Sequence, residues 1–283
     1  MFEVDSSILS NIYKKRPKWS HKGDFGKLLI IGGSKVYTGA PALAAYSAIA
    51  ALRSGADIAY VIAPRRAADV IASFSPNLIA EPVGGEYFTK GHLKHVLEVS
   101  KKFDAISIGS GLGMRKETQD FVLKFLGKVK KPCVIDADAI KALKKRRLGK
   151  NFVLTPHSYE FYAFSGEKPT YDILNRAKMV KKFAKRLDAT ILLKGAIDII
   201  SDGSKVATNK TGNPYMTTGG TGDVLTGVCG GLLAQGVLPF EAACASAYIT
   251  GKAGDFAAKE KGPGLLATDI IEKIPYVIKE VME

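Results

Sequence analysis

The stretch Lys27-Leu28-Leu29-Ile30-Ile31 runs directly into Gly32-Gly33-Ser34, and this junction decides the fold class. The unbroken run of aliphatic residues predicts a β-strand that is buried on both faces, and the two glycines mark its end. Short apolar runs of the same kind recur along the chain and alternate with longer stretches of helical periodicity. Such alternation is typical of α/β proteins, in which helices cover both faces of a mostly parallel sheet.

The same reasoning predicts the other elements. Further strands are expected at 56–63, 104–108, 133–135, 152–154 and 190–193, with a hairpin from 197–200 and 205–208 around Asp202-Gly203. Helices are expected at 41–52, 171–187, 224–236, 240–259 and 267–282. Residues 1–19 are expected to form an N-terminal arm or helix, and residues 20–283 a single domain.

Composition and charge narrow the choice of partner. The chain has 283 residues, 46% of them apolar and 24% charged, and a formal net charge of +14. Such a high positive charge is also found in proteins that bind nucleic acid, so a nucleic-acid partner must be considered. The basic residues are nevertheless spread along the chain in short clusters or at the spacing of a solvated helix face: Lys14-Lys15-Arg16, Lys144-Lys145-Arg146-Arg147, and Lys178, Lys181, Lys182 and Lys185. We therefore expect a field that attracts small anionic substrates, and no nucleic-acid partner.

The sequence predicts a cytoplasmic protein without a membrane partner. Residues 1–10 lack the pattern of a secretory signal, and the longest nearly apolar run, 39–52, is too short to cross a bilayer. Cys133, Cys229 and Cys244 are far apart in apolar surroundings, which predicts buried thiols in a reducing compartment. His92 and His95 lack a third ligand that would indicate zinc.

Glycine or polar residues follow nearly every expected strand. Gly109-Ser110-Gly111-Leu112-Gly113, Asp136-Ala137-Asp138 and Lys194 each come directly after an apolar run. Ligands of open parallel sheets bind outside the carboxyl ends of the strands, so we expect the binding site along this edge. Asp136 and Asp138 fit two roles equally well, as active-site carboxylates or as turn residues that end the strand.

The sharpest functional signal is Thr217-Thr218-Gly219-Gly220-Thr221-Gly222-Asp223-Val224-Leu225, directly before an apolar helix. The free N–H groups of Gly219, Gly220, Thr221 and Gly222 would form a phosphate-binding helix start. Asp223 would take a proton from a hydroxyl that attacks phosphorus. The alternative makes Asp223 an ordinary N-cap. Glycines at 227, 230 and 231 favour the functional interpretation. Each glycine destabilises a helix interior by about 1 kcal/mol relative to alanine, and close packing against a neighbouring element would compensate for that cost.

A second helix start follows the strand at 152–154, in Thr155-Pro156-His157-Ser158-Tyr159-Glu160-Phe161. His157 and Glu160 are three residues apart and can face one side of the first turn. In one interpretation Glu160 holds a Mg²⁺-bound water or a phosphate while His157 contacts the organic substrate. In the other they form a capping box. The residues by themselves leave both open.

Taken in order, these blocks resemble a known family. His21-Lys22-Gly23-Asp24-Phe25-Gly26 and then IIGGS, YTGAP, GSGLG, IDADAI, LTPHSYEF, LLKGAIDII and TGNPYMTTGGTGDVLTG are similar to the ADP-dependent NAD(P)H-hydrate dehydratases, the kinase-like part of the YjeF-type proteins. The resemblance covers roughly residues 20 to 280. Each block is weak alone, and their order makes the match specific.

The resemblance implies a ribokinase-like fold, Mg²⁺ and a nucleotide phosphoryl donor, which is ADP with ATP as the alternative. The implied reaction restores the S epimer of NAD(P)H-hydrate to NAD(P)H by phosphorylating the ring hydroxyl, followed by elimination. It also implies a homotetramer. Carried over by motif, the hydrate would contact Ala40, Gly111, His157 and Asp223. The adenine nucleotide would contact Lys194, Gly195, Ala196, Ile197, Asp198 and Gly222.

Some residues depart from the family pattern. Ser110 stands where proline is usual, Ser158-Tyr159 replaces Pro-Gly, and Thr217 replaces a small apolar residue. These positions flank the implied contacts and bear on substrate detail rather than on reaction type. Many relatives carry a further N-terminal domain that interconverts the hydrate epimers, and that activity is expected to be absent here.

Two alternative functions remain. One is a small-molecule kinase of the same fold, of the hydroxyethylthiazole or hydroxymethylpyrimidine type. The other is a basic nucleic-acid-binding protein on a kinase-like scaffold.

Overall fold

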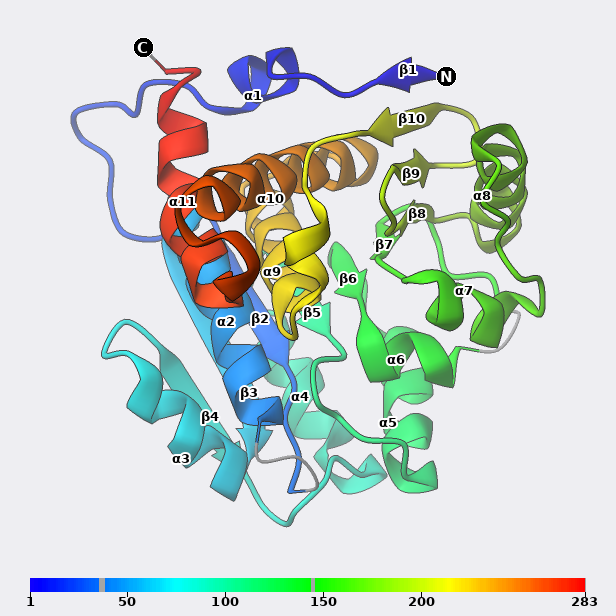
Figure 1. Ribbon diagram of the computed structural model, residues 1–283. Coiled ribbons are helices and arrows are strands. Elements are labelled where there is room, and N and C mark those ends of the chain that lie inside the picture. The colour runs from blue at the N-terminus through cyan, green and yellow to red at the C-terminus, as the bar shows by residue number, and fades with distance from the viewer. Residues whose placement is uncertain (36–38, 144–145, 283) are drawn as a thin grey trace.

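The computed structural model describes residues 1–35, 39–143 and 146–282, which form a ten-stranded sheet between two layers of helices (Figure 1). In sequence order the strands are β1 Phe2–Glu3, β2 Lys27–Ile31, β3 Ile58–Pro64, β4 Ile79–Val83, β5 Ala105–Ile108, β6 Cys133–Ile135, β7 Phe152–Leu154, β8 Thr190–Leu193, β9 Asp198–Ser201 and β10 Val206–Asn209. Across the sheet their order is β1-β10-β9-β8-β7-β6-β5-β2-β3-β4.

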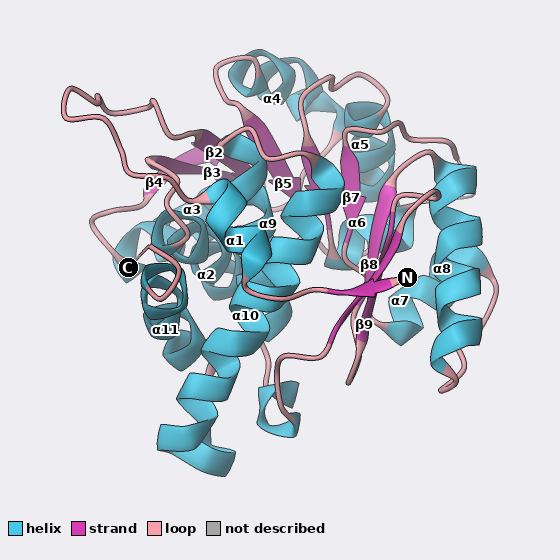
Figure 2. Cartoon of the chain, turned by 90° about the horizontal axis from the view of Figure 1, so that it is seen from above, coloured by secondary structure: helices cyan, strands magenta, loops and turns pink. Residues whose placement is uncertain are grey.

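The helices cover both faces of this sheet. They are α1 Ser7–Ile12, α2 Ala40–Arg53, α3 Arg65–Phe74, α4 Leu93–Ser100, α5 Lys116–Leu126, α6 Ala137–Ala142, α7 Ser158–Ser165, α8 Ile173–Leu187, α9 Thr221–Ala234, α10 Pro239–Lys261 and α11 Ala267–Lys279. Figure 2, which looks along the layers, shows α2, α3, α9, α10 and α11 on one side of the strands and α4 to α8 on the other.

Strand β2 shows how the sequence produces these layers. Successive side chains of a strand point to opposite faces. Leu28 and Ile30 accordingly join the core beneath α2 and α9, while Leu29 and Ile31 join the core beneath α4 and α5. All four are almost completely buried, as the aliphatic run predicts for a central strand.

The sheet is mostly parallel. Strands β4, β3, β2, β5, β6, β7 and β8 run in the same direction, and β9 turns back along β8. Strands β9 and β10 form the predicted hairpin, shifted by one residue from the expected ranges, and β1 adds to its outer edge. The carboxyl ends of the parallel strands therefore meet at one edge, which is where the site is expected.

Most predicted elements are confirmed within a few residues, including β2, β6, β7 and β8, whose bounds match the expected ranges. Strand β4 was missed because Glu81 and Pro82 interrupt its apolar pattern, which an edge strand tolerates. The lysines of α8 are exposed, and the cysteines are free and buried, as expected. Tyr37 and Thr38 of the YTGAP block, and Lys144 and Lys145, lie outside the described residues. No helix in the described ranges is long and apolar enough to span a membrane.

The glycines inside α9 are explained by close helix packing. A Cβ atom at Gly227 would lie 2.1 Å from the carbonyl oxygen of Ser47 on α2. At Gly231 it would lie 2.6 Å from Ser54 Oγ, and at Gly230 3.0 Å from the side chain of Leu28. The helix that carries Asp223 is thus pressed against α2 and β2, which fixes the position of its N-terminus.

We predict that Gly227→Ala destabilises the protein by about 1–3 kcal/mol, although alanine favours a helix interior over glycine by about 1 kcal/mol. The added methyl group has no room unless α9 moves away from Ser47. Urea unfolding would measure the change in free energy. Gly84→Ala is the matched control, because a Cβ atom there meets nothing within 4 Å. Equal stability of the two variants would contradict this account of α9.

Candidate active site

Loops from four neighbouring strands bring polar groups to the carboxyl edge of the sheet. Ser110 follows β5, Asp136 follows β6, Thr155 and His157 follow β7, and Lys194 follows β8. The first turn of α9 faces the same edge. The helix contacts this group through Asp223 in its first turn and Thr226 in its second, whose side chains bond Ser110 and Asp136 respectively.

The start of α9 has the geometry of an anion-binding helix terminus. Gly220 caps the helix with φ +94°, a left-handed conformation that favours glycine. Thr221 Oγ1 donates to the carbonyl oxygens of Met216 and Thr218 at 3.0 and 3.1 Å, which anchors the loop. The first backbone N–H groups of a helix have no intrahelical acceptor and point outward together with the positive end of its dipole. This terminus can therefore hold a phosphate.

Asp223 lies in the first turn of α9, and the N-cap position belongs to Gly220. Its carboxylate accepts a hydrogen bond from Ser110 Oγ at 2.6 Å. Burial, and next the negative charge of Asp136, raise the pKa of Asp223 to about 6, against the opposing effects of the Ser110 hydrogen bond and of Lys194. A carboxylate with such a raised pKa is a better proton acceptor near neutral pH than an ordinary aspartate. The interpretation of Asp223 as a simple N-cap is thus wrong.

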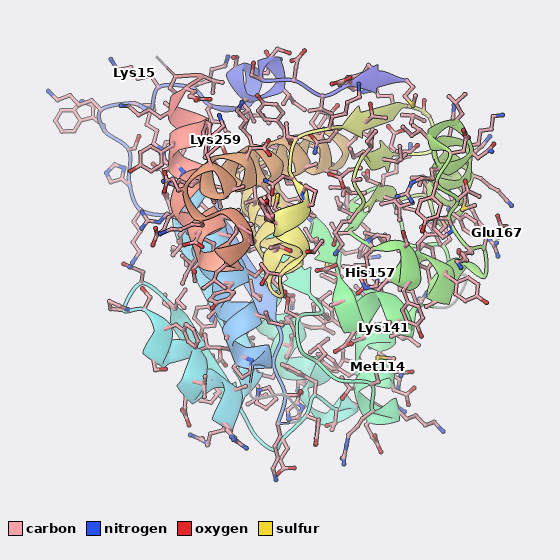
Figure 3. The ribbon with its side chains drawn as sticks, in the orientation of Figure 1. Lys15, Met114, Lys141, His157, Glu167 and Lys259 are labelled. Carbon is pink, nitrogen blue, oxygen red and sulfur yellow. The ribbon has the colours of Figure 1, made fainter. Side chains whose placement is uncertain are left out.

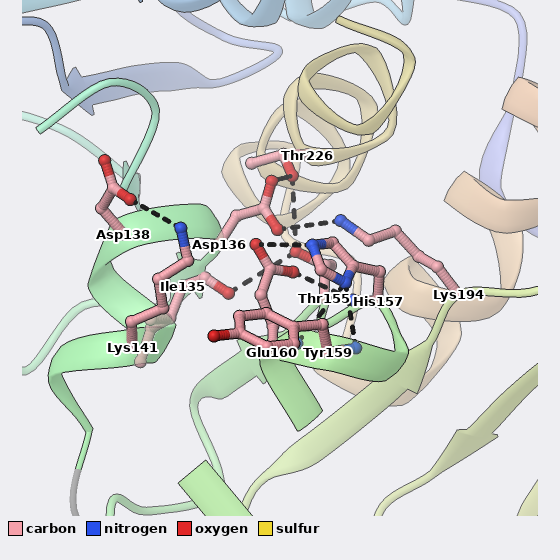
Figure 4. Close-up of polar contacts among 10 residues, drawn as sticks. All are labelled: Ile135, Asp136, Asp138, Lys141, Thr155, His157, Tyr159, Glu160, Lys194 and Thr226. Atoms are coloured by element: carbon pink, nitrogen blue, oxygen red, sulfur yellow. Dashed lines mark hydrogen bonds and ion pairs between the residues drawn. The ribbon is translucent and has the colours of Figure 1, made fainter. Parts of the chain in front are cut away.

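A partly buried ion pair joins three elements beside this carboxylate (Figure 4). Lys194 Nζ lies 3.1 Å from Asp136 Oδ1, and Thr226 Oγ1 donates to Asp136 Oδ2 at 2.8 Å. Burial alone would lower the pKa of Lys194, but Asp136 and then Glu160 raise it above the ordinary value. A Cβ atom at Gly222 would lie 3.2 Å from Lys194 Nζ, so the ammonium group lies directly against the start of α9.

Asp136 and Asp138 also hold the glycine-rich loop after β5. A Cβ atom at Gly109 would lie 1.9 Å from the carbonyl oxygen of Asp136, so only glycine fits there. Gly113 N donates to Asp138 Oδ2 at 2.9 Å, and Lys141 pairs with the other oxygen of Asp138. Asp136 therefore belongs to the polar cluster at the edge, whereas Asp138 shapes the loop that contains Gly111.

His157 and Glu160 form a capping box, which is one of the two arrangements that the sequence allows. Glu160 Oε2 accepts from His157 N at 2.9 Å, while His157 Nδ1 accepts from the backbone N–H groups of Tyr159 and Glu160. Glu160 is buried, and its charge acts on Lys194. Among the described residues, no group of three or more His, Cys, Asp or Glu side chains could hold a metal ion.

The loop after β8 contains a second carboxylate with a raised pKa, Asp198. Asp198 accepts from Gly195 N and from Asn209 Nδ2, both at 3.0 Å. Burial raises the pKa of Asp198 to about 6, against the effects of these two bonds and of the cations Lys194 and Arg176. The two hydrogen bonds fix the shape of the loop from Lys194 to Asp198.

A cavity of about 690 Å³ opens between this loop, the start of α9 and α10. Its lining includes seven of the residues predicted for the site: His157, Lys194, Gly195, Ala196, Asp198, Thr221 and Gly222. Ile197, Gly219, Gly220, Gly111 and Asp223 are not among the described residues that line it. Gly111 lies next to Ser110, the partner of Asp223. Ala40 is the first residue of α2, after the N-cap Gly39.

Sequence reasoning missed the other wall of this cavity. It is formed by Thr211, Gly212, Asn213, Pro214, Met216, Thr217, Leu225, Ala247, Thr250 and Gly251. Ala247, Thr250 and Gly251 belong to α10, whose sequence has the ordinary apolar pattern of a packed helix. That pattern does not indicate which turn lines a cavity. Thr226 was missed for the same reason, because it occupies a core position of α9.

Basic side chains occur on several parts of the surface. Figure 3 places Lys15 and Lys259 toward one end of the molecule and Lys141 far from both. Many surface cations pair with nearby carboxylates, such as Lys90 with Asp120 and Lys182 with Glu167. His95 pairs with Glu81, and His92 helps to cap its own short helix.

The strand order and the glycine-capped helix start beside Lys194 are those of a ribokinase-like α/β protein. The sequence pattern of the NAD(P)H-hydrate dehydratase family matches residues 28–276. The chain belongs to this family.

Individual relatives agree with that assignment. A bifunctional NAD(P)H-hydrate repair enzyme from Pyrobaculum aerophilum is 43% identical over 92% of this chain and 52% of its own length. An ADP-dependent (S)-NAD(P)H-hydrate dehydratase from Cenarchaeum symbiosum is 39% identical, covering 93% of this chain and 92% of its own length. The solved ADP/ATP-dependent NAD(P)H-hydrate dehydratase from Bacillus subtilis, co-crystallised with ATP/Mg²⁺, superimposes with a TM-score of 0.83 at 27% identity, over 98% and 97% of the two chains. The chain spans about half the length of several curated relatives.

The raised pKa of Asp223 has a consequence for stability. An aspartate with a pKa of 3.8 when unfolded and about 6 when folded destabilises the native state above pH 6, and this cost disappears below about pH 4. We predict that Asp223→Asn stabilises the ligand-free protein at pH 8 by on the order of 2 kcal/mol, and much less at pH 4.

Denaturant unfolding at both pH values would test this. The exposed Asp69→Asn serves as control and should change the free energy of unfolding by less than about 0.5 kcal/mol. A loss of stability in Asp223→Asn at pH 8 would show that the carboxylate is a structural support.

Proposed function

We propose that this chain catalyses the ADP-dependent dehydration of the S epimer of NAD(P)H-hydrate back to NAD(P)H, with ATP as the alternative donor. The observation that carries the proposal is the placement of one carboxylate of raised pKa, Asp223, on the same first helical turn that offers free N–H groups to a phosphate. Lys194 adds a positive charge at that turn. The relatives named for this activity support the choice of reaction.

In the proposed mechanism Asp223 takes the proton of the ring hydroxyl as its oxygen attacks the terminal phosphorus of the nucleotide. The bond from that phosphorus to the bridging oxygen breaks, and AMP leaves when ADP is the donor. The N–H groups of the α9 terminus and the Lys194 ammonium group stabilise the negative charge of the transferring phosphoryl group. The new phosphate ester is a good leaving group: the C–O bond breaks and inorganic phosphate departs, while the neighbouring ring carbon loses a proton to water, and the double bond of the dihydronicotinamide ring is restored.

We assign the nucleotide to the cavity beside Lys194. Lys194, Gly195, Ala196, Ile197 and Asp198 would form one wall of its site, and Gly219, Gly220, Thr221 and Gly222 would bind its phosphates. The cavity has room for a nucleoside diphosphate. The hydrate would approach Asp223 from the side of Gly111, with Ala40 and His157 as its other contacts.

Magnesium would arrive with the nucleotide phosphates. The described residues offer no ready cluster of three ligands, but Mg²⁺ is commonly held by substrate phosphates, water and only one or two carboxylates. Glu160, buried beside Lys194, is the proposed protein contact, through water or phosphate. The ion would neutralise phosphate charge. A cytoplasmic location and a homotetrameric assembly complete the proposal.

The direct test combines the purified protein with hydrated NADH, Mg²⁺ and either ADP or ATP, and follows recovery of the dihydronicotinamide absorbance. Recovery with equal release of AMP and inorganic phosphate from ADP supports the dehydratase. A small-molecule kinase would instead leave a stable phosphate ester and no restored ring. No recovery with either nucleotide would refute the proposal.

We predict that Asp223→Asn lowers kcat by about 100- to 10,000-fold while the affinity for ADP stays within about twofold, because the variant loses the proton acceptor and keeps the helix terminus. Single-turnover kinetics and calorimetric titration with ADP would measure the two effects. Equal losses of turnover and of ADP affinity would assign Asp223 to binding instead.

A further inference from the structure

The cavity beside Lys194 has a second, chemically different region. Around Lys194 and Gly222 its wall is charged and rich in N–H groups. Around Ala247 and Thr250 of α10 the wall also includes the apolar side chains of Met216 and Leu225. A nucleotide has the same division, with charged phosphates at one end and a flat heterocycle with a polar edge at the other.

The polar side chains of this second region are nearly all occupied. Thr211 Oγ1 donates to Asn209 Oδ1 at 2.9 Å and also lies 3.3 Å from the carbonyl oxygen of Tyr248. The side-chain amide of Asn213 donates to Gly254 O and accepts from Tyr215 N, at 3.1 and 3.0 Å. Neither side chain is free to bind a ligand without giving up a bond that shapes the loop.

Thr250 is the exception. It is 2% exposed and lines the cavity, yet its hydroxyl has no hydrogen-bond partner among the described residues. Buried hydroxyl groups are rarely left unpaired, and each one that is calls for an explanation. Threonine in a helix has two accessible rotamers, so rotation about one bond can redirect this hydroxyl.

We propose that the Thr250 hydroxyl hydrogen-bonds the nucleobase of the phosphoryl donor. The inference rests on the proposed function for the presence of a nucleotide and adds the residue that binds its base. A hydroxyl can donate and accept, which suits the alternating donors and acceptors along the edge of a purine. The apolar side chains of Met216 and Leu225 enclose the ring, while Lys194 holds the phosphates.

The test compares Thr250→Val with Thr250→Ser by calorimetric titration of ADP. Valine keeps the shape of threonine and removes the hydroxyl, so ADP affinity should fall about three- to tenfold. Serine keeps the hydroxyl, and its affinity should stay within about twofold of the original protein. Inorganic pyrophosphate, which lacks ribose and base, should bind Thr250→Val and the original protein equally.

Ser47→Ala is the matched control. Ser47 also has a buried hydroxyl without a partner, but it lies on α2 and does not line the cavity, so ADP affinity should not change. Unchanged ADP affinity in Thr250→Val, or an equal weakening for pyrophosphate, would overturn the assignment of Thr250 while leaving the dehydratase proposal intact. If the original protein does not bind ADP, both proposals fail together.

Discussion

The ion pair between Lys194 and Asp136 holds the carboxyl edge of the sheet in one arrangement. Asp136 is almost completely buried, and its two oxygens bind Lys194 from the end of β8 and Thr226 from α9. Removing either charged partner would leave the other unpaired in a low-dielectric environment, which is far more costly than leaving both in place. The pair therefore fixes the distance between β6, β8 and α9, and with it the position of Lys194 against the start of the helix.

The other constraint is the direction of α9. Glycines at 227, 230 and 231 bring this helix close to α2 and β2, so that its first turn, with Asp223, lies where the parallel strands end. A helix with ordinary side chains at those positions would lie farther out and carry its N-terminus away from Lys194 and Ser110. Core packing and site geometry are thus the same feature of the structure. In the sequence, this close packing is indicated by a helix that contains more glycine than helix propensity favours.

Local patterns were sufficient to predict most strands of the sheet and the glycine-lined helix start, because both depend on residues adjacent in the chain. The aliphatic run of β2 and the Thr217–Leu225 stretch are examples. What could not be predicted depends on which elements become neighbours in space. In the sequence, Thr226 and Thr250 look like ordinary core residues of their helices. Their roles become visible only in the structure, where Thr226 meets Asp136 and Thr250 lines the same cavity as Met216. Likewise, only the geometry shows that His157 and Glu160 form a capping box.

The site also concentrates features that do not favour folding. The pKa values of Asp223 and Asp198 are both raised to about 6, so each carboxylate destabilises the native protein at neutral pH. The unpaired hydroxyl of Thr250 also destabilises the native protein, because it is buried without a hydrogen bond. A bound nucleotide with a hydroxyl substrate would relieve these costs, since it supplies a proton for one carboxylate and a hydrogen-bond partner for the hydroxyl. The surrounding core, which is tightly packed from β2 to α9, provides the stability that lets such groups persist.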